Sequence, residues 1–144
     1  MNKTETKPSL KIVKELNVPV ELVFKAWTDA KQVVQWMGPG EVKCQDVQID
    51  LKVGGKYRIC MVSAEGDHVA YGQYKEIVPN KRLQYTWAWE KSEMPDTLVT
   101  VEFDSTGKGT RITLIHEGFP AQEAADKHTQ GWTGCIEKLA QFLK

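Results

Sequence analysis

The chain has few cysteines, no long apolar run and no excess charge of either sign. Its 144 residues include 3 cysteines, and 19 Lys and Arg residues balance 19 Asp and Glu residues. Binding to nucleic acid calls for a basic face, so this balance argues against nucleic acid as a partner. No stretch of roughly 18 apolar residues occurs, and membrane insertion is therefore not expected. Small molecules and other proteins remain as possible partners.

The three cysteines are odd in number and far apart. No Cys-x-x-Cys pair occurs, so reduced thiols in a cytoplasmic protein are expected rather than a disulfide framework. The polar N-terminus lacks the apolar core of a signal peptide. Residues 1–9 are expected to form a flexible tail before a single domain over residues 10–144. Gly-rich phosphate loops, nucleophile elbows and HExxH motifs are missing, so no cofactor and no metal are expected.

The most informative segment present is a strand over residues 83–90 with three large aromatic rings on one face. Side chains alternate between the two faces of a strand, which places Leu83, Tyr85, Trp87 and Trp89 together. Filled cores are usually built from compact branched residues. Three adjacent rings, two of them with an indole N–H that needs a partner, indicate the wall of a pocket. The strand does not tell what that pocket holds.

Periodicity predicts a first strand, two short helices, six further strands and a long final helix. The first strand, over residues 10–18, leads to Pro19, whose missing N–H is tolerated in the first turn of a helix. Asp29 is expected to cap the second helix, with Gln32 completing a capping-box pattern. The predicted later strands span residues 42–51, 57–61, 68–78, 83–90, 98–104 and 111–117.

The final helix, over about residues 121–143, carries one continuous apolar stripe. Gly131 and Gly134 flank Trp132 within it. Each Gly costs about 1 kcal/mol relative to Ala in a helix, so the pair indicates a bend or a close approach to another backbone. Strands joined by short turns form an antiparallel sheet whose apolar face needs a cover, and only this helix is long enough. The expected fold is α+β, with the helix over a curved antiparallel sheet of six to seven strands and a cavity enclosed between them.

Five short patterns, in order along the chain, resemble a known family. They are residues 23–29 leading to Trp36, residues 53–58, residues 72–79 with Arg82 and Leu83, residues 116–119, and Gly131 and Trp132 followed by Leu139. Together they are similar to the helix-grip fold of the START and birch-pollen-allergen superfamily (SRPBCC). Within this superfamily, the patterns resemble the branch named after the activator of the heat-shock-protein-90 ATPase, specifically the C-terminal domain of that activator. The resemblance covers about residues 10–143 and implies the fold, but one fold hosts many activities.

A ligand site between the sheet and the final helix is expected to use side chains from both. His116 and His128 are also candidate catalytic residues, because a neutral imidazole can orient a carbonyl or transfer a proton near pH 7. The alternative is that both are hydrogen-bonded at the cavity rim, since no catalytic partner is identifiable. His68 is expected to be exposed, and Met94 to join an adaptable rim. The expected ligand-binding residues are Trp36, Met37, Tyr57, Ile59, Met61, Tyr85, Trp87, Trp89, Val99, Val101, Phe103, His116, His128 and Trp132.

Three functions fit these features. The preferred one is binding of a small, mostly apolar ligand, such as a lipid, polyketide or aromatic metabolite, by a monomer or homodimer. The second is an enzyme of the cyclase, hydratase or hydrolase type that uses the two histidines in the same cavity. The third is a protein-binding module that activates a chaperone ATPase, which requires an exposed apolar patch of several hundred Å². The co-chaperone has a separate N-terminal domain that makes major chaperone contacts, whereas about nine residues precede the first strand here. The resemblance alone therefore does not imply that this protein activates a chaperone ATPase.

Overall fold

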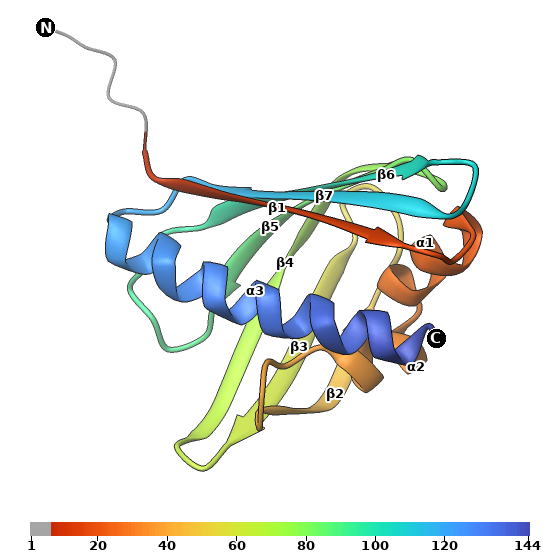
Figure 1. The fold of residues 1–144 in the computed structure, drawn as a ribbon. Coiled ribbons are helices and arrows are strands. Elements are labelled where there is room, and N and C mark those ends of the chain that lie inside the picture. The colour runs from red at the N-terminus through yellow and green to blue at the C-terminus, as the bar shows by residue number, and fades with distance from the viewer. Residues whose placement is uncertain (1–6) are drawn as a thin grey trace, which may run out of the picture.

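Seven antiparallel strands form one curved sheet in the computed structural model, which describes residues 7–144 (Figure 1). The strand order is β1-β7-β6-β5-β4-β3-β2, and every neighbouring pair is antiparallel. This architecture confirms the expected α+β fold with a seven-stranded sheet. The strands are β1 (Ser9–Leu16), β2 (Lys43–Ile49), β3 (Lys56–Ser63), β4 (Gly66–Val78), β5 (Arg82–Trp89), β6 (Thr97–Ser105) and β7 (Thr110–Glu117).

The expected N-terminal tail falls mostly outside the described residues, which begin at Lys7. Ser9, which was assigned to that tail, belongs instead to β1. It pairs with Glu117 at the end of β7, and the N–H of Phe119 donates to the carbonyl of Pro8 at 3.3 Å. The strand starts early because β7 extends far enough to supply these hydrogen bonds.

Two short helices, α1 (Val20–Thr28) and α2 (Ala30–Trp36), follow β1 as predicted. The Asp29 carboxylate caps α2 by accepting the backbone N–H of Lys31 at 3.1 Å. Gln32 does not complete a capping box, because its amide donates to the Asp29 carboxylate at 3.4 Å. The Asp29 N–H is already bonded to the carbonyl of Lys25 at 2.9 Å, since the same residue ends α1.

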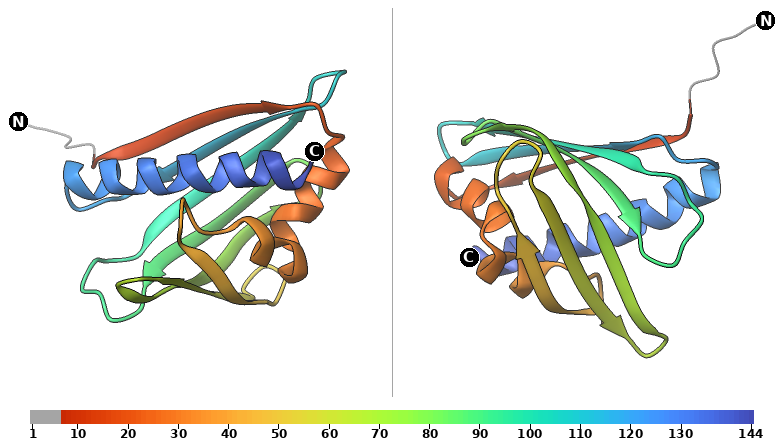
Figure 2. Two further views of the ribbon diagram at one scale, coloured as in Figure 1. Left: turned by 60° about the horizontal axis from the view of Figure 1, so that its bottom comes forward. Right: turned by 180° about the vertical axis from the view of Figure 1, so that it is seen from behind.

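The helix α3 (Gln122–Phe142) lies across the concave face of the sheet, and the strands curve round it (Figure 2). Four residues of the predicted stripe are buried, namely Ala125, Trp132, Ile136 and Leu139, and Cys135 is buried beside them. His128 and Leu143, also expected in the stripe, are half-buried. Gly134 marks the predicted close approach, because a Cβ there would lie 2.6 Å from Pro39 Cβ. The N–H of Gly38 donates to Cys135 Sγ at 3.2 Å beside it. The missing side chain thus lets α3 dock onto the loop between α2 and β2.

The two glycines of α3 give a matched pair of stability variants. Gly134→Ala should lower the free energy of unfolding by about 1–2 kcal/mol, because the rigid Pro39 ring must move. Gly131→Ala should raise it by about 1 kcal/mol, because its Cβ would meet only Pro39 Cγ at 4.0 Å and helix propensity improves. Urea titration of both variants tests this, and equal effects would contradict the proposed docking of α3.

The interior is filled with aromatic rings at the end where α1 and α2 pack. The Trp27 and Trp36 rings lie 4.9 Å apart between centroids, and Trp27 and Phe103 lie 5.8 Å apart. The Trp36 indole donates to the carbonyl of Ala26 at 2.9 Å, and the Trp27 indole donates to the Tyr85 hydroxyl at 3.1 Å. This end of the sheet is therefore a solid core. Within residues 7–144, none of the helices is both long and apolar enough to cross a membrane.

Candidate functional site

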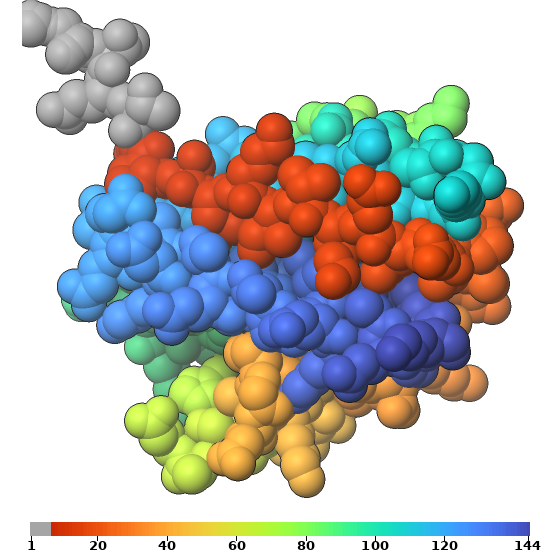
Figure 3. All heavy atoms as spheres, viewed as in Figure 1, coloured from red at the N-terminus to blue at the C-terminus, as the bar shows by residue number. Residues whose placement is uncertain are grey.

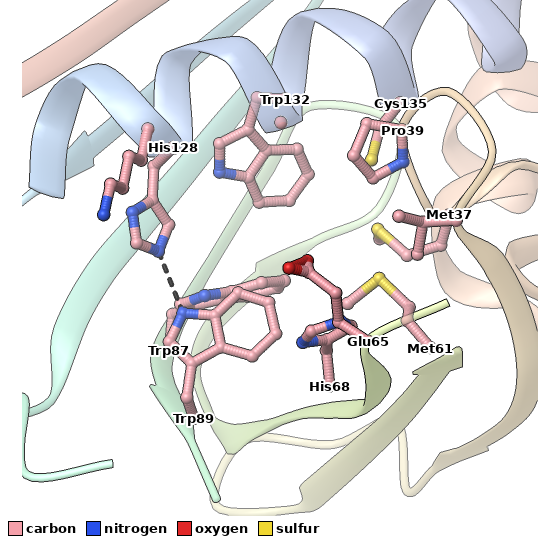
Figure 4. Close-up of a pocket in the computed structure, with 13 residues that line it drawn as sticks. Met37, Pro39, Met61, Glu65, His68, Trp87, Trp89, His128, Trp132 and Cys135 are labelled. Atoms are coloured by element: carbon pink, nitrogen blue, oxygen red, sulfur yellow. Dashed lines mark hydrogen bonds between the residues drawn. The ribbon is translucent and has the colours of Figure 1, made fainter. Parts of the chain in front are cut away.

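A pocket of about 470 Å³ lies between α3, the loop that follows α2, and the strands β3, β4 and β5 (Figure 4). The molecular surface is recessed there, between α3 and the β3–β4 hairpin (Figure 3). Three indoles and three sulfur-containing side chains form most of its interior, and charged groups lie at its mouth. The lining residues are Met37, Pro39, Val42, Met61, Glu65, His68, Trp87, Trp89, Lys127, His128, Gly131, Trp132 and Cys135.

The structure brings together six of the residues expected to bind a ligand and places eight elsewhere. Met37, Met61, Trp87, Trp89, His128 and Trp132 line the pocket. The other eight lie in the packed interior beyond it: Trp36, Tyr57, Ile59, Tyr85, Val99, Val101, Phe103 and His116. Met94, expected at the rim, packs half-buried against that core. Strand parity identifies the concave face correctly, but it does not tell where along that face the packed core ends.

Seven lining residues were missed by sequence reasoning: Pro39, Val42, Glu65, His68, Lys127, Gly131 and Cys135. A helical-spacing signal existed for some, since Lys127, Gly131 and Cys135 recur every four positions with His128 and Trp132 beside them. Glu65 and His68 become predictable only from the β3–β4 register, which sets Met61 opposite His68. His68 was expected to be exposed, but it is half-buried at the wall of the pocket, and its Nε2 bonds to Ser63 Oγ at 2.8 Å.

His116 is fully buried behind the pocket wall, with both ring nitrogens bonded. The Trp132 indole donates to Nδ1 at 3.0 Å, and Nε2 lies 2.6 Å from the Thr97 hydroxyl oxygen. That hydroxyl donates its one proton to the carbonyl of Trp87 at 2.8 Å, so His116 Nε2 must carry the proton between them. A second proton on Nδ1 would face the Trp132 N–H. Burial, with a smaller effect from His128, lowers the pKa of His116 to about 3.

His128 joins α3 to β5 through a second tryptophan. The Trp89 indole donates to His128 Nε2 at 2.9 Å, and Nδ1 lies 2.7 Å from the carbonyl of Ala124, so Nδ1 carries the proton. Burial lowers the pKa of His128 below its ordinary value of 6.5. Each histidine thus has its lone pair occupied by an indole N–H. Neither ring offers the pocket a free base, and both act as links between α3 and the sheet.

Two further polar groups in the pocket wall are the Cys135 thiol and the Trp87 indole nitrogen. Burial raises the pKa of the Cys135 thiol to about 11, so it stays neutral and unreactive at pH 7. Trp87 Nε1 is the buried side-chain nitrogen or oxygen that lacks a hydrogen-bond partner in the described part of the chain. Leaving such a donor unpaired costs about 1–3 kcal/mol. Over residues 7–144, no group of three or more His, Cys, Asp or Glu side chains is placed to hold a metal ion.

The fold and the pocket define a helix-grip protein with an apolar recess under its C-terminal helix. The family model described as activator of Hsp90 ATPase homolog 1-like protein matches residues 17–144. The chain therefore belongs to this family. None of the curated proteins compared with it matches.

Solved structures agree on the fold over nearly the whole chain. Protein CV1439 from Chromobacterium violaceum is 25% identical with a TM-score of 0.87, covering 94% of this chain and 96% of that one. The AHSA1 protein from Silicibacter pomeroyi is 26% identical with a TM-score of 0.82, covering 93% and 96%. Protein NE0264 from Nitrosomonas europaea is 27% identical with a TM-score of 0.81, covering 94% and 93%. Their printed descriptions name no ligand, so they support the architecture and leave the activity open.

Proposed function

We propose that this protein binds one small, mostly apolar molecule in the pocket under α3. The observation that carries this proposal is the recess of about 470 Å³ lined mainly by Trp, Met, Pro and Val side chains. Small-molecule sites are typically concave, apolar and aromatic, with volumes of roughly 300–1,000 Å³. A lipid, a polyketide or an aromatic metabolite is the class of ligand we expect.

Rigid and adaptable walls face one another in this pocket. Trp87, Trp89 and Trp132 are held by packing and, for two of them, by the histidine hydrogen bonds. Met37 and Met61 lie on the side away from His128 (Figure 4). Thioether chains adapt to irregular shapes, whereas indoles supply large fixed surfaces. This combination favours a ligand with a flat or bulky apolar body.

Binding is better supported than catalysis at this site. A general base needs a lone pair within reach of the proton it removes. His116 Nδ1 and His128 Nε2 both accept indole protons, and the neutral Cys135 thiol accepts the Gly38 N–H. A hydrolase, cyclase or hydratase that uses His116 and His128 as its acid–base groups would therefore need one of the links between α3 and the sheet to break.

A chaperone-docking role has less support from the surface. Docking calls for one contiguous apolar patch of several hundred Å². Within residues 7–144, the large apolar side chains that are exposed come from five segments of the sequence: Val13 in β1, Leu22 in α1, Leu51 and Val53 after β2, Tyr71 in β4 and Phe142 in α3. We therefore favour the pocket over the surface as the functional site.

Titration with the apolar fluorophore aminoanthracene tests the proposal. We expect its emission to rise to saturation at one molecule per chain, and decanol to displace it. The three pocket indoles should transfer excitation energy to the dye, so tryptophan emission should fall in parallel. A signal that rises linearly without saturation, or a dye that decanol does not displace, would contradict the proposal.

A further inference from the structure

The mouth of the pocket carries one acidic side chain that the protein leaves uncompensated. Glu65 lies in the β3–β4 turn, and Figure 4 shows its carboxyl group directed toward the space between Trp132 and Trp89. Among the residues that the structure describes, no ion pair and no side-chain hydrogen bond includes this carboxylate. Glu65 is exposed, so a molecule that enters the pocket meets its carboxylate at the mouth.

The other ionisable groups at the mouth do not balance Glu65. Lys127 is paired with Glu123 one helical turn away, with 3.2 Å between Nζ and Oε1. The His128 ring is held neutral by the Trp89 indole and by burial, which lowers its pKa. The His68 Nε2 is bonded to Ser63. Of the two oppositely charged residues in the pocket lining, Glu65 and Lys127, Glu65 is therefore the one without an ion-pair partner among the described residues.

The aromatic walls favour the same sign of ligand. Trp87 lies 5.1 Å from Trp132 at 52° between ring planes, and 5.4 Å from Trp89 at 87°, so the three indoles face different directions. Indole faces carry negative electrostatic potential and attract cations, whereas a carboxylate beside them gains nothing. A cation placed between Glu65 and these faces would be stabilised by both.

We infer that the ligand is an amphipathic organic cation, with an amine or quaternary ammonium head on an apolar body. The head lies at the mouth, between Glu65 and the indoles of Trp89 and Trp132. The body fills the interior against Met37 and Met61. This inference rests on the proposed function and narrows it from an apolar molecule to a positively charged one.

Three probes with the same alkyl chain test the charge preference: decyltrimethylammonium, decanol and decanoate. Dissociation constants are measured by displacement of aminoanthracene from the intact protein. We expect the ammonium compound to bind about tenfold more tightly than decanol, because attraction to an indole face and to a nearby carboxylate lowers the dissociation constant of a cation by about that factor. Decanoate should bind more weakly than both.

Two variants that each remove one negative charge distinguish the effect of the Glu65 carboxylate from the effect of the net charge of the protein. Glu65→Gln should weaken the binding of decyltrimethylammonium about tenfold and that of decanol by much less, because only the cation has a charge–charge interaction with the carboxylate. Glu137→Gln removes the same charge from an exposed position of α3 outside the pocket lining and should change neither affinity. Both positions are exposed, so both variants should keep the wild-type thermal midpoint.

The outcomes separate this inference from the proposed function. Equal binding of all three probes, unaffected by Glu65→Gln, would overturn the cation preference and leave the apolar pocket standing. Failure of all three probes to displace the dye would overturn the pocket itself. Tighter binding of decanoate would assign the site to anions through Lys127 and overturn the inference.

Discussion

Lowering the pH from 7 to 5 is expected to reduce the free energy of unfolding by about 2 kcal/mol through His116. The pKa of this ring is lowered from 6.5 to about 3 in the folded protein, chiefly by burial. Between these two values the unfolded chain binds a proton that the folded chain excludes. The contribution of His116 to the free energy of unfolding is therefore fully present above pH 6.5 and is lost progressively as the pH falls toward 3. His128, whose pKa burial also lowers, acts in the same direction.

Urea unfolding at pH 7 and pH 5 measures this effect, and His116→Gln isolates it. Glutamine keeps a donor for Thr97 and an acceptor for Trp132 but does not titrate in this range. We expect the variant to lose most of the pH dependence, retaining the smaller part due to His128. Equal pH dependence in the wild type and the variant would show that His116 is not the buried neutral link described here.

Closing the pocket with Gly131→Phe is expected to weaken decanol binding by more than about 30-fold, because a filled site loses most of the apolar contact that drives binding. Gly131 lines the pocket, and a Cβ there would meet only Pro39 Cγ at 4.0 Å. A phenyl ring can therefore project into the recess without displacing backbone. Phe is also a better helix residue than Gly, so the fold should be retained.

Gly131→Ala is the matched control for the blocking variant. Its methyl group occupies little of a pocket of about 470 Å³, so decanol affinity should stay within about threefold of the wild type. Displacement titrations and thermal midpoints of both variants are compared. Wild-type affinity in a folded Gly131→Phe protein would place the ligand elsewhere.

Local sequence patterns were enough to predict the fold. The alternation in β5 sets Leu83, Tyr85 and Trp87 on the buried face, as observed. The apolar stripe predicted α3 within one residue at either end, because periodicity over six turns leaves little choice of face. The glycine pair pointed to a close approach, and Gly134 is where α3 meets Pro39.

The extent of the pocket depends on tertiary contacts that no local pattern encodes. Tyr85 and Trp87 share one strand face, yet Tyr85 accepts the Trp27 indole in the packed core while Trp87 lines the recess. The difference arises because α1 and α2 fill only one end of the groove. The hydrogen bond from Trp132 to His116 joins α3 to β7, and the two residues are 16 positions apart in the sequence. The length of this bond and the tautomer of the histidine follow only from the assembled fold.

The five tryptophans of the chain provide the most direct test of a ligand pocket under α3. Trp87, Trp89 and Trp132 line the pocket, whereas Trp27 and Trp36 lie in the filled core and serve as internal controls. A nitrogen–proton correlation spectrum resolves one indole signal for each, and decanol is titrated into the labelled protein. The account predicts that the three pocket signals shift to saturation while the two core signals stay in place. Shifts that are equal across all five signals, or confined to Trp27 and Trp36, would contradict it.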